Sequence, residues 1–498
     1  MEINGKPLTQ MTIADARTAL LAGEVSVVEL VTAHHARIDA FDQSGPALNA
    51  MVTVSDESLQ VAEGLDAALR AGATPGPLFG VPVVVKDNLL TSGMPTSFGS
   101  KGFRDYRSAR DATVVSNLRG AGAIVIGKTT MPDWASAWFA NSSRSGWTKN
   151  PHALGHSAGG SSSGTAVGIA AGYAPIGLGT DTGSSIRLPA AFCNLVGLRP
   201  TPGLVSRDGC SPIVAMQDTI GPMARNVTDL TKVFDVLVGF DPADPLTHRH
   251  SFARRGAPYV NALREDSMRG KRLGVLRGAF APDSVDTREV NRVMESALLQ
   301  CMAGGATLVD VEEEWLPRLI ERTFLYRFAA RRDLNNWLKE QPGVPFTRIE
   351  DIVGQGGFDP RIPLLSYIGD PSDGRTSSSA FHAAIEAREE LLSRLVGTLE
   401  ANRLDAFVFP TTQSTPPLLG DVMDPAWNTV DGFLSPSVLA SSAGMPALSI
   451  PAGFSSHGLP VGMEILGRPF DESTVISVAY GFEQLGSHHH APVSTPAF

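Results

Sequence analysis

Cysteine, long hydrophobic runs and clustered positive charge are all scarce in this chain of 498 residues. The three cysteines (Cys193, Cys210 and Cys301) are too few and too scattered to predict a disulfide framework or a zinc-binding pattern. We expect free thiols in a reducing, cytoplasmic compartment, and no resident metal. Because no stretch of about 18 residues is apolar throughout, no transmembrane helix is predicted.

Positive charge is also in deficit. The 41 lysines and arginines face 51 acidic residues, which gives a formal net charge of −10. No basic run offsets this balance, so a nucleic-acid partner is not predicted. The N-terminal segment has no basic region followed by an apolar one; we therefore expect no signal peptide and no membrane association. The three adjacent histidines at 488–490 lack further ligands in the sequence around them, and we interpret them as solvated.

What the chain does contain is an alternation of apolar strands and helical segments. Its 43% hydrophobic and 18% charged residues are typical of a globular protein with a large core. The segments 79–88 and 123–130 are rich in valine and isoleucine, like strands buried on both faces, and 112–120 between them has a helical pattern. This order predicts an α/β fold.

The densest concentration of glycine and serine lies between His156 and Pro189. Such a stretch fits either a flexible linker or a backbone that approaches a ligand closely. Apolar residues within it, among them Val167, Ile169 and Leu178, disfavour a solvated linker. We therefore interpret the stretch as a buried and chemically active loop system.

Two familiar motifs fit this stretch poorly. Residues 160–164 read G-S-S-S-G, which satisfies the G-x-S-x-G pattern of a nucleophile elbow. That motif needs a strand before the turn and a positioned histidine after it, whereas the preceding NPHALGHSAG has no strand pattern and no downstream histidine stands out. A phosphate-binding P-loop is disfavoured because no Lys-Ser or Lys-Thr pair follows the glycines.

Lysine is rare, and Lys86 stands where a valine-rich strand stops. The simpler interpretation is a strand-end lysine that extends to solvent. The alternative is a buried lysine whose pKa is lowered toward neutrality, so that it can act as a base. Such a base could activate Ser185, which follows a run of backbone amides suited to an oxyanion, with Ser161 as a proton relay. Position alone leaves both interpretations open.

Four segments together resemble the amidase signature family. They read GVPVVVKDN, DATVVSNLRGAGAIVIGKTTMPDW, residues 158–191 in full, and GMPALSIPAGFSSHGLPVGMEILG, in the order and separation that the family shows. The resemblance implies that Ser185 is the acyl-forming nucleophile. It also implies that Ser161 is a bridging serine preceded by a cis peptide bond, and that Lys86 is the base that starts the relay.

The resemblance also implies a fold and its subdivision. We expect a large mixed β-sheet sandwiched by helices, in a single large domain. Along the chain this gives an N-terminal helical region (1–75), a catalytic core (76–240), a variable cover or insert (241–375) and the C-terminal part of the core (376–498). No metal or organic cofactor is implied.

Near the nucleophile, the family places an oxyanion hole formed by the backbone amides of Thr182, Gly183 and Ser184, together with that of Ser185. The chain departs from the family at two glycine positions, where it has Ser163 and Ser184. Ser163 is expected to change the local backbone angles slightly. Ser184 is expected either to trim the acyl pocket or to point away from it.

The loop 131–151 is rich in aromatic residues, which either line a pocket or roof the core. The pocket hypothesis assigns Trp134, Ala135, Trp138 and Leu188 to the substrate site. Family members that bind a carboxylate substrate, or that serve as the glutamine-using subunit of a transamidation complex, tend to have a polar residue where this chain has Leu188. Neutral, apolar or aryl amides are therefore expected, and Arg187 is interpreted as scaffold.

The predicted function is the hydrolysis of linear carboxylic amides through an acyl-enzyme. Carbamate or ester hydrolysis by the same chemistry is an alternative. The roles of a glutamine amidotransferase subunit or a non-catalytic binding subunit are less favoured, the latter because Lys86, Ser161 and Ser185 are all present. We expect a small-molecule amide as the partner, and a homodimer as one arrangement compatible with the sequence.

Overall fold

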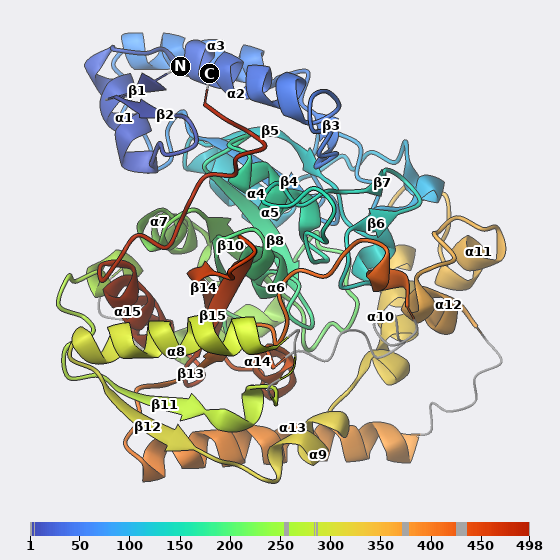
Figure 1. Ribbon diagram of the computed structural model, residues 1–498. Helices are drawn as coiled ribbons and strands as arrows, with labels where there is room; N and C mark the ends of the chain where they lie inside the picture. Colours follow the sequence, from blue (N-terminus) through green and yellow to red (C-terminus); the bar gives the residue numbers. More distant parts are fainter. Residues whose placement is uncertain are drawn as a thin grey trace.

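A computed structural model describes residues 2–3, 5–252, 258–282, 284, 287–370, 378–424 and 436–497. Within these residues, one mixed sheet of eleven strands runs through the molecule in the order β12-β11-β13-β15-β14-β9-β10-β8-β4-β5-β3 (Figure 1). Its strands are β3 (Met51–Val54), β4 (Pro82–Lys86), β5 (Ile124–Thr129), β8 (Ile176–Asp181), β9 (Val196–Arg199), β10 (Thr219–Ala224), β11 (Arg272–Leu276), β12 (Thr307–Val311), β13 (Ala406–Pro410), β14 (Ala447–Phe454) and β15 (Pro460–Leu466). The predicted mixed sheet is confirmed.

The sheet is buried on both faces because alternate apolar residues of its strands point into different clusters. In β4, Val83 and Val85 belong to one cluster and Val84 to another. In β13, Val408 packs on one side and Phe407 on the other. Parallel pairing joins β4 to both β5 and β8, so these three strands present their carboxyl ends at the same edge. Ligand sites of α/β sheets occur at such edges.

Helices cover both faces of the sheet. One set packs on β4, β5, β8, β9 and β14: α4 (Thr113–Gly120), α5 (Ser163–Ala170), α6 (Arg187–Phe192), α7 (Val227–Leu237), α8 (Arg288–Ala303) and α15 (Glu472–Glu483). A second group, α9 (Leu316–Glu321), α13 (Ser378–Ala401) and α14 (Val438–Ala443), packs together at the end where β11 to β13 lie (Figure 1). The predicted single large domain is confirmed by this continuous sheet.

The N-terminal helices α1 (Ile13–Ala22), α2 (Val27–Phe41) and α3 (Ser58–Arg70) lie together at the β3–β5 side of the molecule (Figure 1). Ser26 caps α2, because its side chain accepts a hydrogen bond from the backbone of Glu29 while the Glu29 side chain accepts one from Ser26. The remaining short strands form two ribbons, β1 (Glu2–Ile3) with β2 (Lys6–Pro7) and β6 (Asn141–Ser142) with β7 (Gly146–Trp147).

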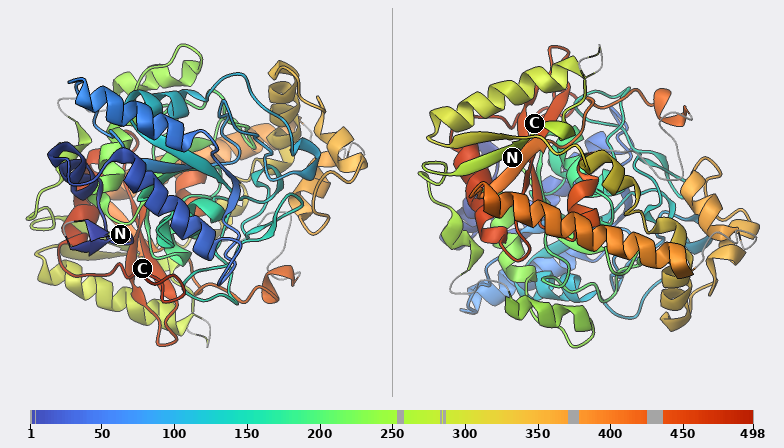
Figure 2. Two further views of the ribbon diagram at one scale, coloured as in Figure 1. Left: turned by 90° about the horizontal axis from the view of Figure 1, so that it is seen from above. Right: turned by 90° about the horizontal axis from the view of Figure 1, so that it is seen from below.

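Residues 312–370 form the cover, which includes α10 (Tyr326–Glu340), α11 (Ile349–Gly354) and α12 (Pro363–Gly369). Both views of Figure 2 place these gold helices at one end of the molecule, away from α8. The cover therefore begins later than the predicted residue 241. Residues 272–311 instead supply β11, α8 and β12 to the main sheet, since their apolar residues such as Leu273 and Val275 are fully buried in its core.

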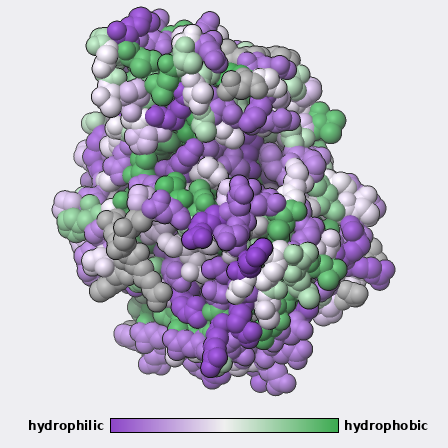
Figure 3. Space-filling model, turned by 90° about the vertical axis from the view of Figure 1, so that its left-hand side faces the viewer, coloured by the Kyte–Doolittle hydropathy of each residue, from purple (hydrophilic) through white to green (hydrophobic). Residues whose placement is uncertain are grey.

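Short segments of 3₁₀ helix also connect these elements, at Lys101–Phe103, Asp133–Ala135, Pro245–Phe252, Tyr259–Ala262, Arg277–Ala279 and Asp421–Met423. Across the described residues, every helix is too short or too polar to span a bilayer. On the face drawn in Figure 3, hydrophobic residues occur in separate small groups among hydrophilic ones.

Candidate active site

Lys86 ends β4 and is fully buried, so the interpretation of a lysine extending to solvent is wrong. Its Nζ donates a hydrogen bond to Ser161 Oγ at 2.7 Å and another to Thr180 Oγ1 at 2.8 Å. Thr180 lies on the neighbouring strand β8 and also accepts a hydrogen bond from Asn88 Nδ2 at 3.1 Å. The structure thus brings together Lys86 and Ser161, which are far apart in sequence, and adds Thr180, which sequence reasoning missed.

The environment of Lys86 favours its neutral form. Burial lowers the pKa of Lys86 to about 7, although the nearby groups Cys210, Asp181 and Asp218 act in the opposite direction. A lysine with this pKa is partly deprotonated at neutral pH and can accept a proton, whereas an ordinary lysine cannot. The amine is therefore suited to the role of base.

A base that must be neutral gives the reaction a defined pH dependence. We expect kcat/KM for an amide to fall about tenfold per pH unit below about pH 7, where Lys86 becomes protonated, and to level off above it. A pH–rate profile of the purified protein measures this. A profile that is flat from acid to alkaline pH would contradict the assignment of Lys86 as base.

Ser161 is held in a tight backbone setting between Gly160 and α5. The peptide bond between Gly160 and Ser161 is cis, in agreement with the expectation from the family resemblance. A Cβ atom on Gly160 would lie 2.9 Å from the carbonyl oxygen of Phe139, so this position accepts only glycine. Ser161 itself is fully buried, with its hydroxyl on Lys86.

Ser185 lies in the loop between β8 and α6 and is partly exposed. Its carbonyl oxygen accepts a hydrogen bond from the N–H of Ser162 at 3.1 Å, which ties the loop of Ser185 to the segment that carries Ser161. Within the described residues, the Ser185 hydroxyl has no hydrogen-bond partner. The structure therefore contains the Lys86–Ser161 contact but not a Ser161–Ser185 hydrogen bond, and catalytic contacts of this kind often form only with bound substrate.

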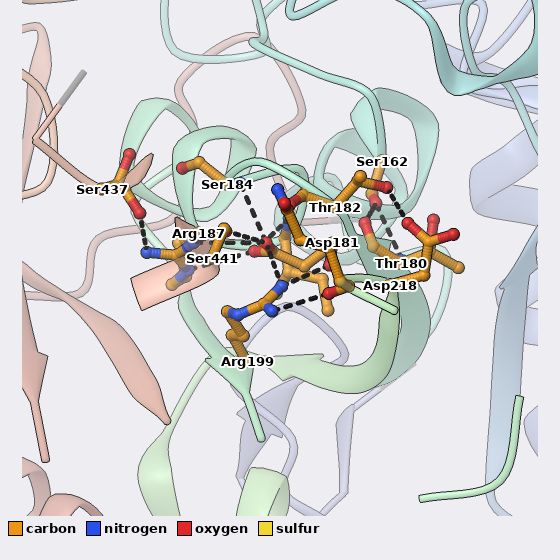
Figure 4. A network of polar contacts seen from close by, with 12 residues as sticks. Ser162, Thr180, Asp181, Thr182, Ser184, Arg187, Arg199, Asp218, Ser437 and Ser441 are labelled. Atoms are coloured by element: carbon orange, nitrogen blue, oxygen red, sulfur yellow. Dashed lines mark hydrogen bonds and ion pairs between the residues drawn. The ribbon is translucent and has the colours of Figure 1, made fainter. Parts of the chain in front are cut away.

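Asp181, the last residue of β8, organises the loop that carries Ser185 (Figure 4). Its carboxylate accepts hydrogen bonds from the backbone N–H of Ser184 at 2.8 Å and of Ile186 at 3.2 Å. The guanidinium groups of Arg187 and Arg199 also contact it, at 3.0 and 2.9 Å. Burial alone would raise the pKa of Asp181, but these two cations hold it well below its usual range. Asp181 therefore stays ionised.

Arg187 is fully buried and joins this loop to distant parts of the chain. It pairs with Asp181 and with Glu464 of β15. It also donates hydrogen bonds to the carbonyl of Ser437 and to Ser441 Oγ, both near α14 (Figure 4). The interpretation of Arg187 as scaffold agrees with these contacts, since a buried cation with several partners holds its surroundings in place.

The four backbone amides assigned to an oxyanion hole differ in whether the protein already gives them a partner. The N–H of Ser184 is bonded to Asp181, so it is not directed toward a substrate. The backbone N–H groups of Thr182, Gly183 and Ser185 have no partner among the described residues, and Gly183 and Ser185 both line the adjacent cavity. The donors available to an oxyanion are therefore these three amides.

The two serines that replace family glycines have different backbone conformations. Ser184 has φ of +89°, a region that L-residues seldom adopt, and its buried hydroxyl has no partner within the described part of the chain. Ser184 is absent from the cavity lining, so its side chain points away from the acyl pocket. Ser163 begins α5 with ordinary helical backbone, and its Oγ donates to the carbonyl of Gly159 at 2.6 Å.

This difference predicts opposite effects of glycine at the two positions. Ser184→Gly should stabilise the protein by about 1 kcal/mol, because it relieves an unfavourable φ and removes an unsatisfied buried hydroxyl. Ser163→Gly, the matched control, should destabilise it by about 0.5–1 kcal/mol through a lost hydrogen bond and greater chain entropy. Urea unfolding of both variants measures the difference. Equal effects of the two substitutions would contradict the assigned strain.

A cavity of about 740 Å³, including its open mouth, lies in front of Ser185. Of the four predicted pocket residues, Ala135, Trp138 and Leu188 line it. Trp134 does not. Its ring stacks on Phe98 at a centroid distance of 4.7 Å inside the core. Part of the aromatic loop therefore lines the pocket, and part of it fills the core.

The cavity wall carries no ionisable acid or base among the described residues apart from the phenol of Tyr326. Its apolar part includes Trp138, Phe139, Leu188, Phe324, Leu364 and Val438, and its polar part consists of neutral groups, namely Ser136, Ser185, Gln217, Thr323, Tyr326 and Ser442. Four of these polar residues come from outside the motifs identified in the sequence, which is why sequence reasoning missed them. A substrate bound here meets an apolar surface with a few uncharged hydrogen-bonding groups.

Elsewhere in the part of the chain that the structure describes, no group of three or more His, Cys, Asp or Glu side chains has an arrangement suited to a metal ion. The three cysteines are free and buried, as expected. The site thus consists of the buried Lys86–Ser161 pair, the loop that carries Ser185, and the neutral cavity in front of it.

Comparison with known proteins shows to which family this chain belongs. The sequence profile of the family described as Amidase matches residues 29–476. A glutamyl-tRNA(Gln) amidotransferase subunit from Symbiobacterium thermophilum is 37% identical over 97% of this chain and 98% of that protein. The crystal structure of native peptide amidase from Stenotrophomonas maltophilia is 33% identical, with a TM-score of 0.84 over 98% of this chain and 99% of that one.

A further solved structure, the corresponding glutamyl-tRNA(Gln) amidotransferase subunit from Thermotoga maritima, is 27% identical, with a TM-score of 0.75 over 97% of this chain and 98% of that one. The family profile and these relatives all cover nearly the whole chain, including the segments that carry Lys86, Ser161 and Ser185. The chain belongs to the amidase family.

Proposed function

We propose that this protein hydrolyses neutral carboxylic amides with an apolar or aryl group, through an acyl-enzyme on Ser185. The observation that carries this proposal is the fully buried Lys86, whose Nζ lies 2.7 Å from Ser161 Oγ beside the loop of Ser185. A desolvated amine, a relay hydroxyl and a serine next to unpartnered backbone amides are the parts that acyl transfer needs.

In the proposed reaction, Ser185 Oγ attacks the amide carbon and forms the C–O bond. Its proton passes to Ser161 Oγ, which gives its own proton to neutral Lys86. The carbonyl oxygen becomes an oxyanion and accepts hydrogen bonds from the backbone amides near Gly183. When the C–N bond breaks, the proton returns from Lys86 through Ser161 to the leaving amine. Water then attacks the ester by the same relay and releases the carboxylic acid.

The neutral cavity supports the substrate class. A free glutamine carries an ammonium and a carboxylate group, and burying either without a partner costs several kcal/mol. The described lining supplies no opposite charge for them, and Leu188 adds only apolar surface. An anilide or an alkyl amide has no charge to satisfy and gains from contact with Trp138, Phe139 and Leu188.

A substrate comparison tests this proposal. The purified protein should hydrolyse an acylanilide such as 4-nitroacetanilide, and Ser185→Ala, as the control, should not. Turnover of glutamine or malonamic acid should be at least about tenfold slower in kcat/KM. Preference for the charged substrates would overturn the assigned class. Esters and aryl carbamates are added to the substrate comparison. An ester would form an acyl-enzyme on Ser185, and a carbamate would form a carbamoyl-enzyme.

A second candidate is a subunit of a glutamine-dependent amidotransferase with protein partners. The similarity to curated proteins of that name, up to 37% identity over nearly the whole chain, favours it. In that case the isolated chain would release ammonia from glutamine, and partner subunits would be needed for transfer. The same comparison separates the two candidates, because glutamine would then exceed the anilide in kcat/KM.

A further inference from the structure

The polar side chains of the cavity differ in whether the protein already satisfies them. Ser136 Oγ donates to the carbonyl of Trp134, and Thr323 and Ser442 are hydrogen-bonded to each other at 2.9 Å. Gln217 donates to the carbonyl of Thr182 and accepts from Arg388. These side chains already make hydrogen bonds within the cavity wall, so few of their donors and acceptors remain free for a ligand.

Ser185 and Tyr326 are the exceptions. Within the described residues, neither hydroxyl has a hydrogen-bond partner, although both residues line the cavity. One of these free hydroxyls is the proposed nucleophile. The other is on a tyrosine that begins α10, in the cover, so it reaches the cavity from a part of the chain far from the other site residues.

Tyr326 Oη lies directly against the loop of the nucleophile. A Cβ atom built on Gly183 would be 2.2 Å from Tyr326 Oη, and the next atom of that side chain, Cζ, would be 3.4 Å away. The hydroxyl therefore occupies the space beside Gly183, within the same cavity as Ser185 and next to one of the unpartnered backbone amides.

The phenol keeps its proton in this setting. Burial raises the pKa of Tyr326, and the negative charges of Asp218 and Asp181 raise it further, while Arg199 and Arg388 oppose the shift. Tyr326 therefore has an O–H group to donate across the neutral and alkaline range. Tyr326 is partly buried and lines the cavity, so a ligand bound there can accept a hydrogen bond from this free donor.

We propose that Tyr326 is a specificity-determining residue whose hydroxyl donates a hydrogen bond to a second, uncharged acceptor on the substrate, close to the scissile amide. The inference rests on the proposed function and narrows its substrate class. Preferred substrates carry a neutral carbonyl next to the amide that is cleaved, as an N-acylated amino amide does. A simple alkyl amide lacks this acceptor and leaves the Tyr326 hydroxyl without a substrate partner.

Two matched amides test the assignment. N-Acetylphenylalaninamide and 3-phenylpropanamide share the ring and the scissile amide, and only the former has a second carbonyl beside it. Tyr326→Phe should lower kcat/KM for N-acetylphenylalaninamide about tenfold and change that for 3-phenylpropanamide by less than about twofold. A merely structural role for Tyr326 would lower both values equally. An equal loss on both amides, or no loss on either, would overturn the inference.

The activity of the wild-type protein shows whether a negative result concerns Tyr326 alone or the proposed function. If it cleaves neither amide nor an acylanilide, and Ser185→Ala behaves identically, the proposed function fails and the substrate contact fails with it. If it cleaves the acylanilide but neither amide, only the substrate contact is overturned. If it cleaves both and Tyr326→Phe leaves their ratio unchanged, only the role of Tyr326 is overturned. Thermal unfolding of Tyr326→Phe, which removes one oxygen, should match that of the wild type within a few degrees.

A double variant checks the position of the hydroxyl independently. Gly183→Ala places a methyl group on Tyr326 Oη and should lower kcat/KM for 3-phenylpropanamide about tenfold or more, because the nucleophile loop or the cover must shift. In Gly183→Ala/Tyr326→Phe the clash is gone, and activity on this amide should recover most of the loss. A double variant as impaired as Gly183→Ala alone would contradict the contact on which the inference depends.

Discussion

Replacing Lys86 with alanine should lower kcat for amide hydrolysis by about a thousandfold or more, while the protein remains folded. The substitution removes the amine that donates to Ser161 Oγ at 2.7 Å and that, in the proposed reaction, takes up the proton of Ser185. It also leaves the rest of the valine-rich strand intact. Steady-state rates on an acylanilide, with circular dichroism as a check of the fold, measure the effect.

Lys128 provides the matched control. It is also a fully buried lysine, on the adjacent strand β5, and burial lowers its pKa to about 8. Its ammonium group is used structurally, at 3.5 Å from Asp87 and 2.7 Å from the carbonyl of Leu89. Lys128→Met should therefore lower the free energy of unfolding, but kcat/KM should still fall below about pH 7. If it abolished turnover while Lys86→Ala did not, the assignment of the base would be wrong.

Replacing Asp181 with asparagine should destabilise the fold by about 3–5 kcal/mol and abolish most activity. The substitution leaves Arg187 and Arg199, both fully buried, without the carboxylate between them. Asparagine also keeps only one of the two oxygens that accept from the backbone N–H groups of Ser184 and Ile186, on either side of Ser185. Urea unfolding gives the loss of stability.

The control for this prediction is an exposed ion pair. Asp208 pairs with Arg110 near the surface, with half of the Arg110 side chain exposed. Asp208→Asn should cost no more than about 1 kcal/mol and leave turnover unchanged, because exposed pairs contribute little. Comparable losses from Asp181→Asn and Asp208→Asn would show that the buried network around Asp181 is not central to the loop.

The resemblance to the amidase signature motifs singled out Lys86, Ser161 and Ser185, whereas position in the sequence alone left the role of Lys86 open. Burial of the valine-rich strand on both faces could also be predicted, because a continuous run of β-branched residues is typical of a strand covered on both sides. The same reasoning could not decide whether Lys86 turned inward. That depends on β8 lying beside β4 and on Thr180 accepting a hydrogen bond there.

Contacts between distant segments account for what the sequence did not reveal. Tyr326 reaches Gly183 from the cover, and no spacing rule connects the two residues. Trp134 was expected in the pocket but packs on Phe98, because its backbone turn at φ of +53° directs the ring into the core. The bonding of the Ser184 N–H to Asp181 depends on how the loop folds back on the end of its own strand.

The most direct test of the central claim is covalent labelling of the nucleophile. The protein is treated with a fluorophosphonate, digested and analysed by mass spectrometry. We predict one phosphonyl group on the peptide that contains Ser185, no labelling of Ser185→Ala, and much slower labelling of Lys86→Ala at neutral pH. Labelling at another serine, or none at all in the wild-type protein, would contradict an acyl-enzyme mechanism through Ser185.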